Sequence, residues 1–326
     1  MKPVTVLMPV FNGAPFLAGA ISAVLRQSFG EFELLVVDDG STDGSPGIAR
    51  SFRDPRIRIL ENGGNLGIVR TLNRGLAEAR TPWIARCDAD DISHPRRLEK
   101  QYALALATPG AGFVGSHSRI VDARGRVKGF SRTASSHEAI CWDLCFRNPF
   151  PHSSAFFLRD GADYLAVPAA EDYDLWSRIA RSHRLASVSQ ALVDYRQHPD
   201  SIMAKHGSST GATKHRGILG IMEGNLQRFA GMGDAPADLK FLAEGWIEPP
   251  ETREGIRAYW RTYGNLLARV PRQPDLRLVV SEHLFTKFCH YRDRRLARFF
   301  LVSLPVTFLP RLPLFRALFL LAVRHP

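Results

Sequence analysis

The stretch VTVLMPVFN at residues 4–12 is an apolar, strand-like run that ends in a polar loop. A second run, FELLVV at 32–37, is continuously apolar, as expected for a strand that is buried on both faces. Segments with helical spacing follow these runs at 15–27 and 42–52. Strands are then predicted at 56–60 and 83–87, and helices at 67–79 and 93–107, the last capped by Ser93. Repeated strand–helix units predict an α/β fold with a mostly parallel sheet flanked by helices.

The pattern changes after about residue 112. Short strands are predicted at 113–115, 155–158 and 186–193, around helices at 136–146 and 171–181. We interpret residues 1–204 as one domain with two halves, 1–110 and 111–204. Beyond residue 205 the signal is helical and basic, which predicts a separate C-terminal region at 205–326.

Polar clusters follow the first, second and fourth predicted strands. The cluster after the fourth strand, Asp88-Ala89-Asp90-Asp91, is the most acidic. In parallel sheets the carboxyl ends of the strands meet at one edge, where ligands bind. Carboxylates two residues apart on an extended chain point the same way, so Asp88 and Asp90 can address one ligand. Mg²⁺ and Mn²⁺ prefer such oxygen ligands. The alternative is a solvated acidic turn in which Asp91 or Ser93 only caps a helix.

Composition and cysteine usage narrow the class of protein. Hydrophobic residues make up 45% of the 326 residues and charged residues 23%, which favours a globular protein over a disordered one. The four cysteines form no CxxC pair, which favours a reducing compartment. No signal peptide precedes the first strand pattern, so a cytoplasmic location is expected.

Positive charge is concentrated at the C-terminal end. Residues 251–326 carry 14 Lys and Arg against 5 Asp and Glu, which is +9 of the net +11. Residues 299–323 are very apolar, but the longest charge-free run has 12 residues, whereas a membrane span needs about 20. This composition predicts a segment that lies on an anionic membrane surface. A buried or oligomer-forming helical hairpin is the alternative, and no nucleic-acid motif accompanies the charge.

Five motifs occur here in the order and spacing of family 2 glycosyltransferases, so the chain resembles that family over about residues 4 to 200. They are VTVLMPVFN (4–12), VVDDGSTD (36–43), Asn65-Leu66-Gly67, Asp88-Ala89-Asp90-Asp91 and Glu171-Asp172. The resemblance implies a Rossmann-like GT-A fold. Residues 1–110 would bind a nucleotide-sugar and residues 111–204 an acceptor.

The resemblance also implies a set of donor-binding residues. The nucleotide base would contact the first two strand ends, and the diphosphate would lie near the helix at 67–79 and the segment Tyr195-Arg196-Gln197-His198. The implied donor-binding residues are Pro9, Phe11, Asn12, Asp39, Asn65, Gly67, Arg70, Asp88 and Arg196. The base looks like uracil in many relatives, so a UDP-sugar is the expected donor.

The implied chemistry needs a cation and a base. Asp90 would ligate Mg²⁺ or Mn²⁺, with Asp88 and His198 as further ligands. Asp172 would take the proton from the acceptor hydroxyl, and Asp174 is a second candidate. One base and an attack from the opposite face predict inversion at the anomeric carbon. The motif Gln-x-x-Arg-Trp of processive members has no counterpart here, so a single addition is expected.

The expected function is therefore sugar transfer to a saccharide or lipid-linked acceptor, in surface polysaccharide or glycolipid synthesis at the inner face of the cell membrane. Two alternatives remain. A sugar-1-phosphate nucleotidyltransferase would favour a Gly-rich loop and a Lys after the first strand, and Asn12-Gly13-Ala14-Pro15 lacks both. A non-catalytic sugar-binding or membrane scaffold would not need the carboxylates. We expect no nucleic-acid partner.

Overall fold

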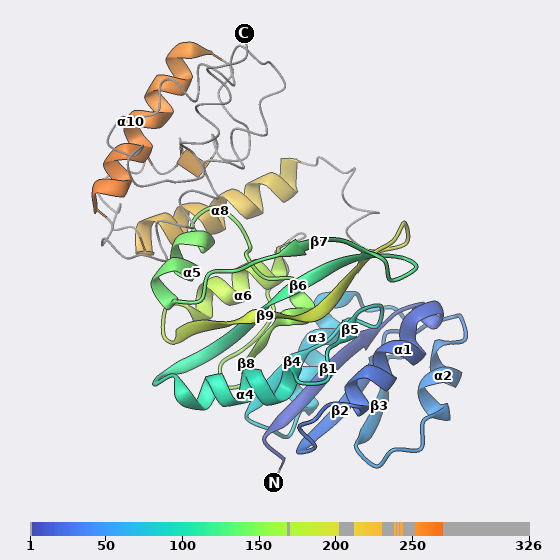
Figure 1. The fold of residues 1–326 in the computed structure, drawn as a ribbon. Coiled ribbons are helices and arrows are strands. Elements are labelled where there is room, and N and C mark those ends of the chain that lie inside the picture. The colour runs from blue at the N-terminus through green and yellow to red at the C-terminus, as the bar shows by residue number, and fades with distance from the viewer. Residues whose placement is uncertain are drawn as a thin grey trace. The chain divides into compact units, whose positions relative to one another are not determined.

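A computed structural model of the chain describes residues 2–167, 170–201, 212–229, 238, 240, 242, 243 and 252–269. The chain divides into two compact units (Figure 1). The first unit contains residues 1–140 and 148–217, and the second contains 141–147 and 218–326. The boundary that we predict after residue 204 stays a prediction, because residues 202–211 lie outside the described part.

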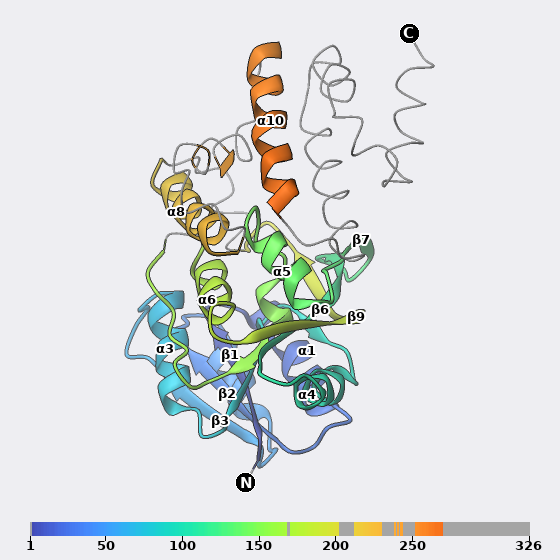
Figure 2. The same ribbon diagram turned by 90° about the vertical axis from the view of Figure 1, so that its left-hand side faces the viewer.

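The first half of unit 1 is the predicted parallel α/β arrangement. Its strands pair in the order β3-β2-β1-β4, and all three pairings are parallel. The elements are β1 (Val4–Val10), α1 (Ala14–Leu25), β2 (Phe32–Asp38), α2 (Ser45–Ser51), β3 (Ile57–Glu61), α3 (Ile68–Glu78) and β4 (Trp83–Arg86). Helix α3 covers one side of this sheet and α1 the other (Figure 2).

The sequence of β1 explains this layering. All seven of its residues are buried, so the strand is covered on both faces. Val6 and Met8 join the core cluster that contains Leu17 and Ile21 of α1. Leu7 points the other way, toward α3, where a Cβ on Gly75 would lie 2.3 Å from the Leu7 Cδ1 atom. Only a glycine at this point lets α3 approach the strand so closely.

The second half extends the same sheet with mixed pairing. Strand β8 is antiparallel to both β4 and β6, whereas β6 and β9 are parallel, and β7 and β5 add antiparallel edges. The elements are β5 (Ile92–Ser93), α4 (Arg97–Ala107), β6 (Ala111–Asp122), β7 (Val127–Ser131), α5 (His137–Leu144), η1 (His152–Ser154), β8 (Phe156–Leu158), α6 (Glu171–Ile179) and β9 (Arg184–Gln197).

The prediction that Ser93 caps a helix is wrong. Ser93 lies in β5, where it pairs with Val193 of β9, and α4 begins only at Arg97 with Arg96 at the N-cap. The Ser93 hydroxyl instead accepts a hydrogen bond from Arg97 Nη1 at 3.0 Å. A short strand, β5, directly follows the acidic loop and lies where the sequence pattern predicted the start of a helix.

The described part of unit 2 contains α8 (Ala212–Phe229), from Ile218 onward, and α10 (Arg253–Arg269). Trp142 is buried and its ring lies 5.5 Å from Phe146 and 6.2 Å from Tyr263. No helix in the described part of the chain is long and apolar enough to cross a bilayer. The apolar segment 299–323, for which we predict membrane contact, lies outside the described residues.

Candidate functional site

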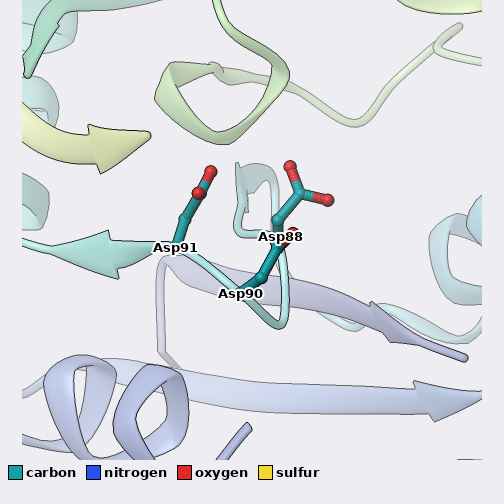
Figure 3. Close-up of side chains that lie close together, drawn as sticks. All are labelled: Asp88, Asp90 and Asp91. Carbon is teal, nitrogen blue, oxygen red and sulfur yellow. The ribbon is translucent and has the colours of Figure 1, made fainter. Parts of the chain in front are cut away.

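Three carboxylates lie together in the loop between β4 and β5. One ligand atom from each of Asp88, Asp90 and Asp91 lies within 4.8 Å of the others (Figure 3). Like charges at this separation repel one another unless protons, cationic side chains or a bound cation offset them. The structure meets this repulsion differently at each of the three residues.

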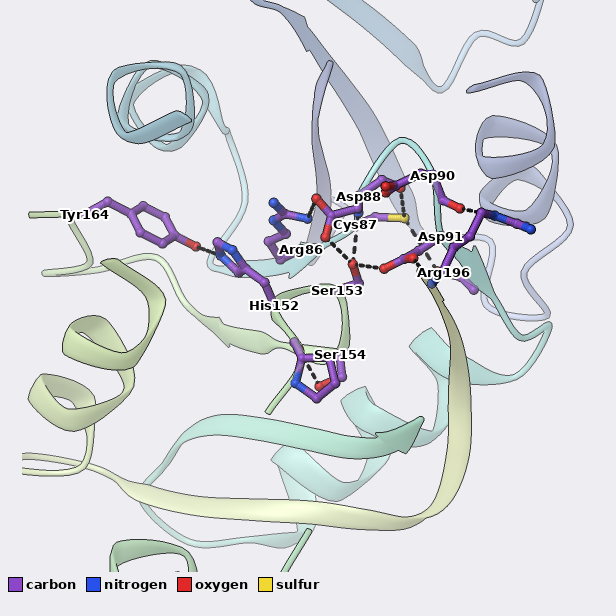
Figure 4. Close-up of polar contacts among 12 residues, drawn as sticks. Arg86, Cys87, Asp88, Asp90, Asp91, His152, Ser153, Ser154, Tyr164 and Arg196 are labelled. Atoms are coloured by element: carbon purple, nitrogen blue, oxygen red, sulfur yellow. Dashed lines mark hydrogen bonds and ion pairs between the residues drawn. The ribbon is translucent and has the colours of Figure 1, made fainter. Parts of the chain in front are cut away.

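Asp88 is held by two protein partners. It forms an ion pair with Arg86, which is 2% exposed, and accepts a hydrogen bond from Ser153 Oγ at 2.5 Å (Figure 4). Burial would raise the pKa of Asp88, but the Arg86 charge and these hydrogen bonds hold the pKa below its usual value. Both oxygens of Asp88 are therefore in use within the protein.

Asp91 is the most deeply buried of the three and is 1% exposed. Its Oδ1 accepts a hydrogen bond from the backbone N–H of Arg196 at 2.7 Å, and its Oδ2 contacts Ser153 Oγ. Burial, followed by the charges of Asp88 and Asp90, raises the pKa of Asp91 well above its usual value. Asp91 is thus a buried structural group rather than the solvated helix cap considered from sequence.

Asp90 faces His198. Asp90 Oδ2 lies 2.9 Å from His198 Nε2, and the ring of Phe16 lies 4.8 Å from the imidazole. The other Asp90 oxygen bonds to no other residue in the described part of the chain. Burial and then the Asp88 charge raise the pKa of Asp90. A carboxylate that bonds to one other residue, an imidazole, suits a divalent cation such as Mg²⁺ or Mn²⁺.

Arg196 lies beside this pair, but its guanidinium is bound within the protein. Nε donates to the Asp90 carbonyl at 2.8 Å, and Nη1 lies within 3.2 Å of the carbonyls of Asp122 and Ala123. The guanidinium also lies over the Phe16 ring, 4.9 Å from its centre. Arg196 thus joins the acidic loop to the β6–β7 hairpin, and its predicted contact with a diphosphate stays a prediction.

The predicted base-binding residues lie where β1 ends. Pro9 is buried in β1, and Phe11 just beyond it is 49% exposed, which is unusual for a large apolar side chain beside a core strand. Asn12 has a left-handed φ of 51° and accepts a hydrogen bond from Thr42 N at 2.9 Å. This bond ties the loops after β1 and β2 together beneath the exposed ring.

Asp39 organises the next loop. Its carboxylate accepts hydrogen bonds from Asn62 Nδ2 at 2.6 Å, Leu66 N at 2.8 Å and Gly67 N at 3.0 Å. Asp39 is 4% exposed, so these donors replace water at a buried charge. The bonds fix the start of α3, where Asn65 Oδ1 also accepts from Gly67 N and Arg70 is exposed in the first turn.

Asp172 lies in the first turn of α6, and its bonding partners differ from those of Asp174. Asp172 accepts hydrogen bonds from Asn148 Nδ2 at 2.8 Å and from Tyr173 N at 2.7 Å. Burial, followed by the neighbouring Glu171 charge, raises the pKa of Asp172 to about 7. Asp174 instead forms an ion pair with Arg178 at 2.7 Å. Of the two candidates, Asp172 has the environment of a general base.

Two observations bring the separate segments to one place. Burial and then the charges of Asp88, Asp91, Asp90 and Asp172 raise the pKa of Tyr195, so all four carboxylates are near enough to act on one side chain. A Cβ on Gly13 would lie 3.4 Å from Ala89 Cβ, so the loop after β1 contacts the acidic loop. The strand ends and α6 therefore border one site.

Sequence reasoning missed several residues of this site. Arg86 has no motif signal because it lies inside an apolar strand, and Asn148 and Ser153 are far from their partners in the chain. His152 Nε2 lies 2.8 Å from the hydroxyl of Tyr164, and this pair lies next to the Arg86–Asp88 contact (Figure 4).

The sequence of the chain matches a known family. The model of the family "Glycosyl transferase family 2" matches residues 5–163. An uncharacterized glycosyltransferase of Haemophilus influenzae is 30% identical over 60% of this chain, and the match spans 65% of that relative's length. The O-antigen biosynthesis glycosyltransferase WbnJ of Escherichia coli is 31% identical over 61% of this chain and 81% of its own length.

The fold is also similar to a solved structure. The crystal structure of S. aureus TarS in complex with UDP-GlcNAc superposes with a TM-score of 0.59 at 16% sequence identity. The superposition covers 92% of this chain and 90% of that one. At this identity the likeness supports the GT-A fold and nothing finer.

Proposed function

This chain belongs to glycosyltransferase family 2, and we propose that it transfers a sugar from a UDP-sugar to an acceptor hydroxyl with inversion. The observation that carries the proposal is the difference between two carboxylates, Asp90 beside His198 in the acidic loop and Asp172 held by Asn148 at the start of α6. Asp90 offers a free oxygen beside His198, whereas Asp172 has a pKa raised to about 7. One suits a cation that accompanies a diphosphate, and the other suits proton removal.

The donor side of the proposal rests on the strand ends. An exposed Phe11 ring offers a face for a nucleotide base, and Asp39 holds the loop that precedes α3. Asp90 and His198 would hold the divalent cation. When bound, that cation would offset the negative charge that develops on the departing diphosphate.

The acceptor side rests on Asp172. A carboxylate with a pKa near 7 is half deprotonated at neutral pH, and it still binds a proton strongly enough to remove one from a hydroxyl. Asn148 fixes the orientation of one oxygen through its amide. With a single base on this side, attack occurs opposite the leaving diphosphate, which inverts the anomeric carbon.

The substrate classes come from the relatives. A UDP-sugar is supported by the TarS structure, which is a complex with UDP-GlcNAc, and a saccharide acceptor is supported by WbnJ, which is an O-antigen biosynthesis glycosyltransferase. The basic, apolar sequence at 290–326 supports a location at the inner membrane face, where a lipid-linked acceptor would lie. Flotation with anionic liposomes, with and without residues 290–326, tests that location.

Asp172→Asn tests the reaction. The amide keeps the shape and cannot accept the acceptor's proton, so turnover should fall by about 10²–10⁴-fold while donor binding stays within about twofold. Asp174→Asn is the matched control and should retain most of the turnover. Wild-type turnover in Asp172→Asn would refute the base assignment.

A further inference from the structure

The three carboxylates of the acidic loop are used unequally. Asp88 and Asp91 have both oxygens engaged by protein groups, whereas Asp90 has one oxygen that no other described residue contacts. By their spacing alone, all three carboxylates could be ligands of one cation, and the distances between them allow this. Their surroundings distinguish Asp91, because it is 1% exposed and both of its oxygens are held by protein groups, so a cation could reach it only by opening packed contacts.

We propose that Asp91 and Ser153 are positioning residues, which form a buried clamp that fixes Asp88 and leaves Asp90 and His198 to face the cation. The clamp rests on the metal-dependent function proposed above. Asp91 would not be a ligand itself. Its side chain acts through the backbone of the loop and through Ser153.

Burial and bonding of the clamp support this role. Asp91 is 1% exposed and Ser153 is fully buried, so a cation reaching Asp91 would have to open a packed contact. The Ser153 hydroxyl lies between the two carboxylates, contacting Asp91 and lying 2.5 Å from Asp88 Oδ2. It also accepts a bond from the Asp88 backbone N–H at 3.3 Å. One hydroxyl thereby separates two carboxylates that would otherwise meet.

The clamp joins three segments that are distant in sequence. Ser153 comes from η1, Asp91 from the loop before β5, and the N–H that Asp91 accepts comes from Arg196 at the end of β9. Arg196 returns to the loop by donating to the Asp90 carbonyl at 2.8 Å. The position of Asp90 beside His198 therefore depends on Asp91 and Ser153, neither of which contacts the imidazole.

Asp91→Asn separates a clamp from a ligand. An asparagine can accept the Arg196 N–H through its oxygen and donate to Ser153 through its amide, so the clamp should survive. We expect the Mn²⁺ dissociation constant of the full chain, measured by the electron paramagnetic resonance of free Mn²⁺, to stay within about threefold of wild type. Asp90→Asn should weaken Mn²⁺ binding by about 100-fold, because it removes a ligand.

Ser153→Ala and Ser154→Ala form a matched pair. Both serines are fully buried, and Ser154 Oγ donates to the Pro151 carbonyl at 2.8 Å without touching the acidic loop. Ser153→Ala should weaken Mn²⁺ binding about tenfold, as loss of a partner that orients a ligand does. Ser154→Ala should leave Mn²⁺ binding unchanged even if it lowers the melting temperature as much as Ser153→Ala does. Ser153→Thr keeps the hydroxyl and should bind Mn²⁺ about as well as wild type.

Two results would overturn the clamp. Asp91→Asn could lose Mn²⁺ as fully as Asp90→Asn does, which would make Asp91 a ligand. Ser153→Ala and Ser154→Ala could show equal Mn²⁺ affinity, which would reduce Ser153 to a packing residue. A wild-type chain that binds no Mn²⁺ and transfers sugar without metal would instead refute the metal-dependent function, and with it the clamp.

Discussion

Carboxylates in the two halves of the sheet differ in how many hydrogen-bond donors surround them. In the parallel half, Asp39 accepts three hydrogen bonds from N–H donors around one loop. In the mixed half, Asp172 accepts two and faces the Glu171 charge, and its pKa rises to about 7. The donor-saturated Asp39 holds its loop in place. At the unsaturated Asp172, burial and the Glu171 charge outweigh the two hydrogen bonds and raise the pKa.

Removal of the saturated carboxylate should have the largest effect on stability. Asp39→Ala removes three hydrogen bonds, and at about 1 kcal/mol each the free energy of unfolding should fall by about 3 kcal/mol. Urea unfolding measures this. Asp43→Ala is the control, because the exposed Asp43 accepts from Ala14 N and Ser45 N and should cost about 1 kcal/mol or less. Equal losses would show that Asp39 does not organise its loop.

The unsaturated carboxylate should set the acid side of the activity profile. Because Asp172 acts only when deprotonated, kcat/KM should fall about tenfold per pH unit below pH 7. Donor binding, measured over the same range, should change less. A kcat/KM that stays constant down to pH 5 would remove Asp172 as the base, since its proton would then not control the reaction.

A smaller effect should appear in stability, with the opposite sign from Asp39. A pKa raised to about 7 means that the folded state holds a proton that the unfolded state releases near pH 4, so this group lowers stability as pH rises from 4 to 7. Asp172→Asn removes that penalty. We expect a gain on the order of 2 kcal/mol at pH 8, disappearing toward pH 4.

Thermal or urea unfolding across pH checks this gain. Asp174→Asn, which breaks the ion pair with Arg178, should instead lose up to about 1 kcal/mol at neutral pH. An Asp172→Asn variant that is less stable than wild type at pH 8 would contradict the raised pKa.

The same comparison explains what the sequence could predict. In the parallel half, apolar runs that alternate with helical segments show where the strands lie along the chain, so β1 to β4 and the polar clusters at their ends were predictable. The roles of Asp39, Asp90 and Asp172 follow from the family resemblance and stay predictions. The GT-A fold is confirmed by the family and structure comparisons.

The partners of those residues were not predictable. Ser153 meets Asp91 across 62 positions of the chain, and Arg196 meets it across 105, through pairings in the mixed half that no local pattern encodes. The helix start assigned to Ser93 failed for the same reason, because pairing with β9 makes that residue a strand. Contacts between residues that are distant in sequence therefore set the geometry of the site, whereas local motifs indicate only which residues belong to it.

We propose that carboxylates from separate segments of the chain border one cation-dependent site. The most direct test is a crystal structure with Mn²⁺ and UDP, using the anomalous signal of manganese to locate the ion. We predict one peak at about 2.1–2.2 Å from an Asp90 oxygen and next to His198, with UDP beside it and Asp172 facing the same cleft. A manganese peak remote from Asp90, or UDP bound on a surface that excludes Asp172, would contradict the account.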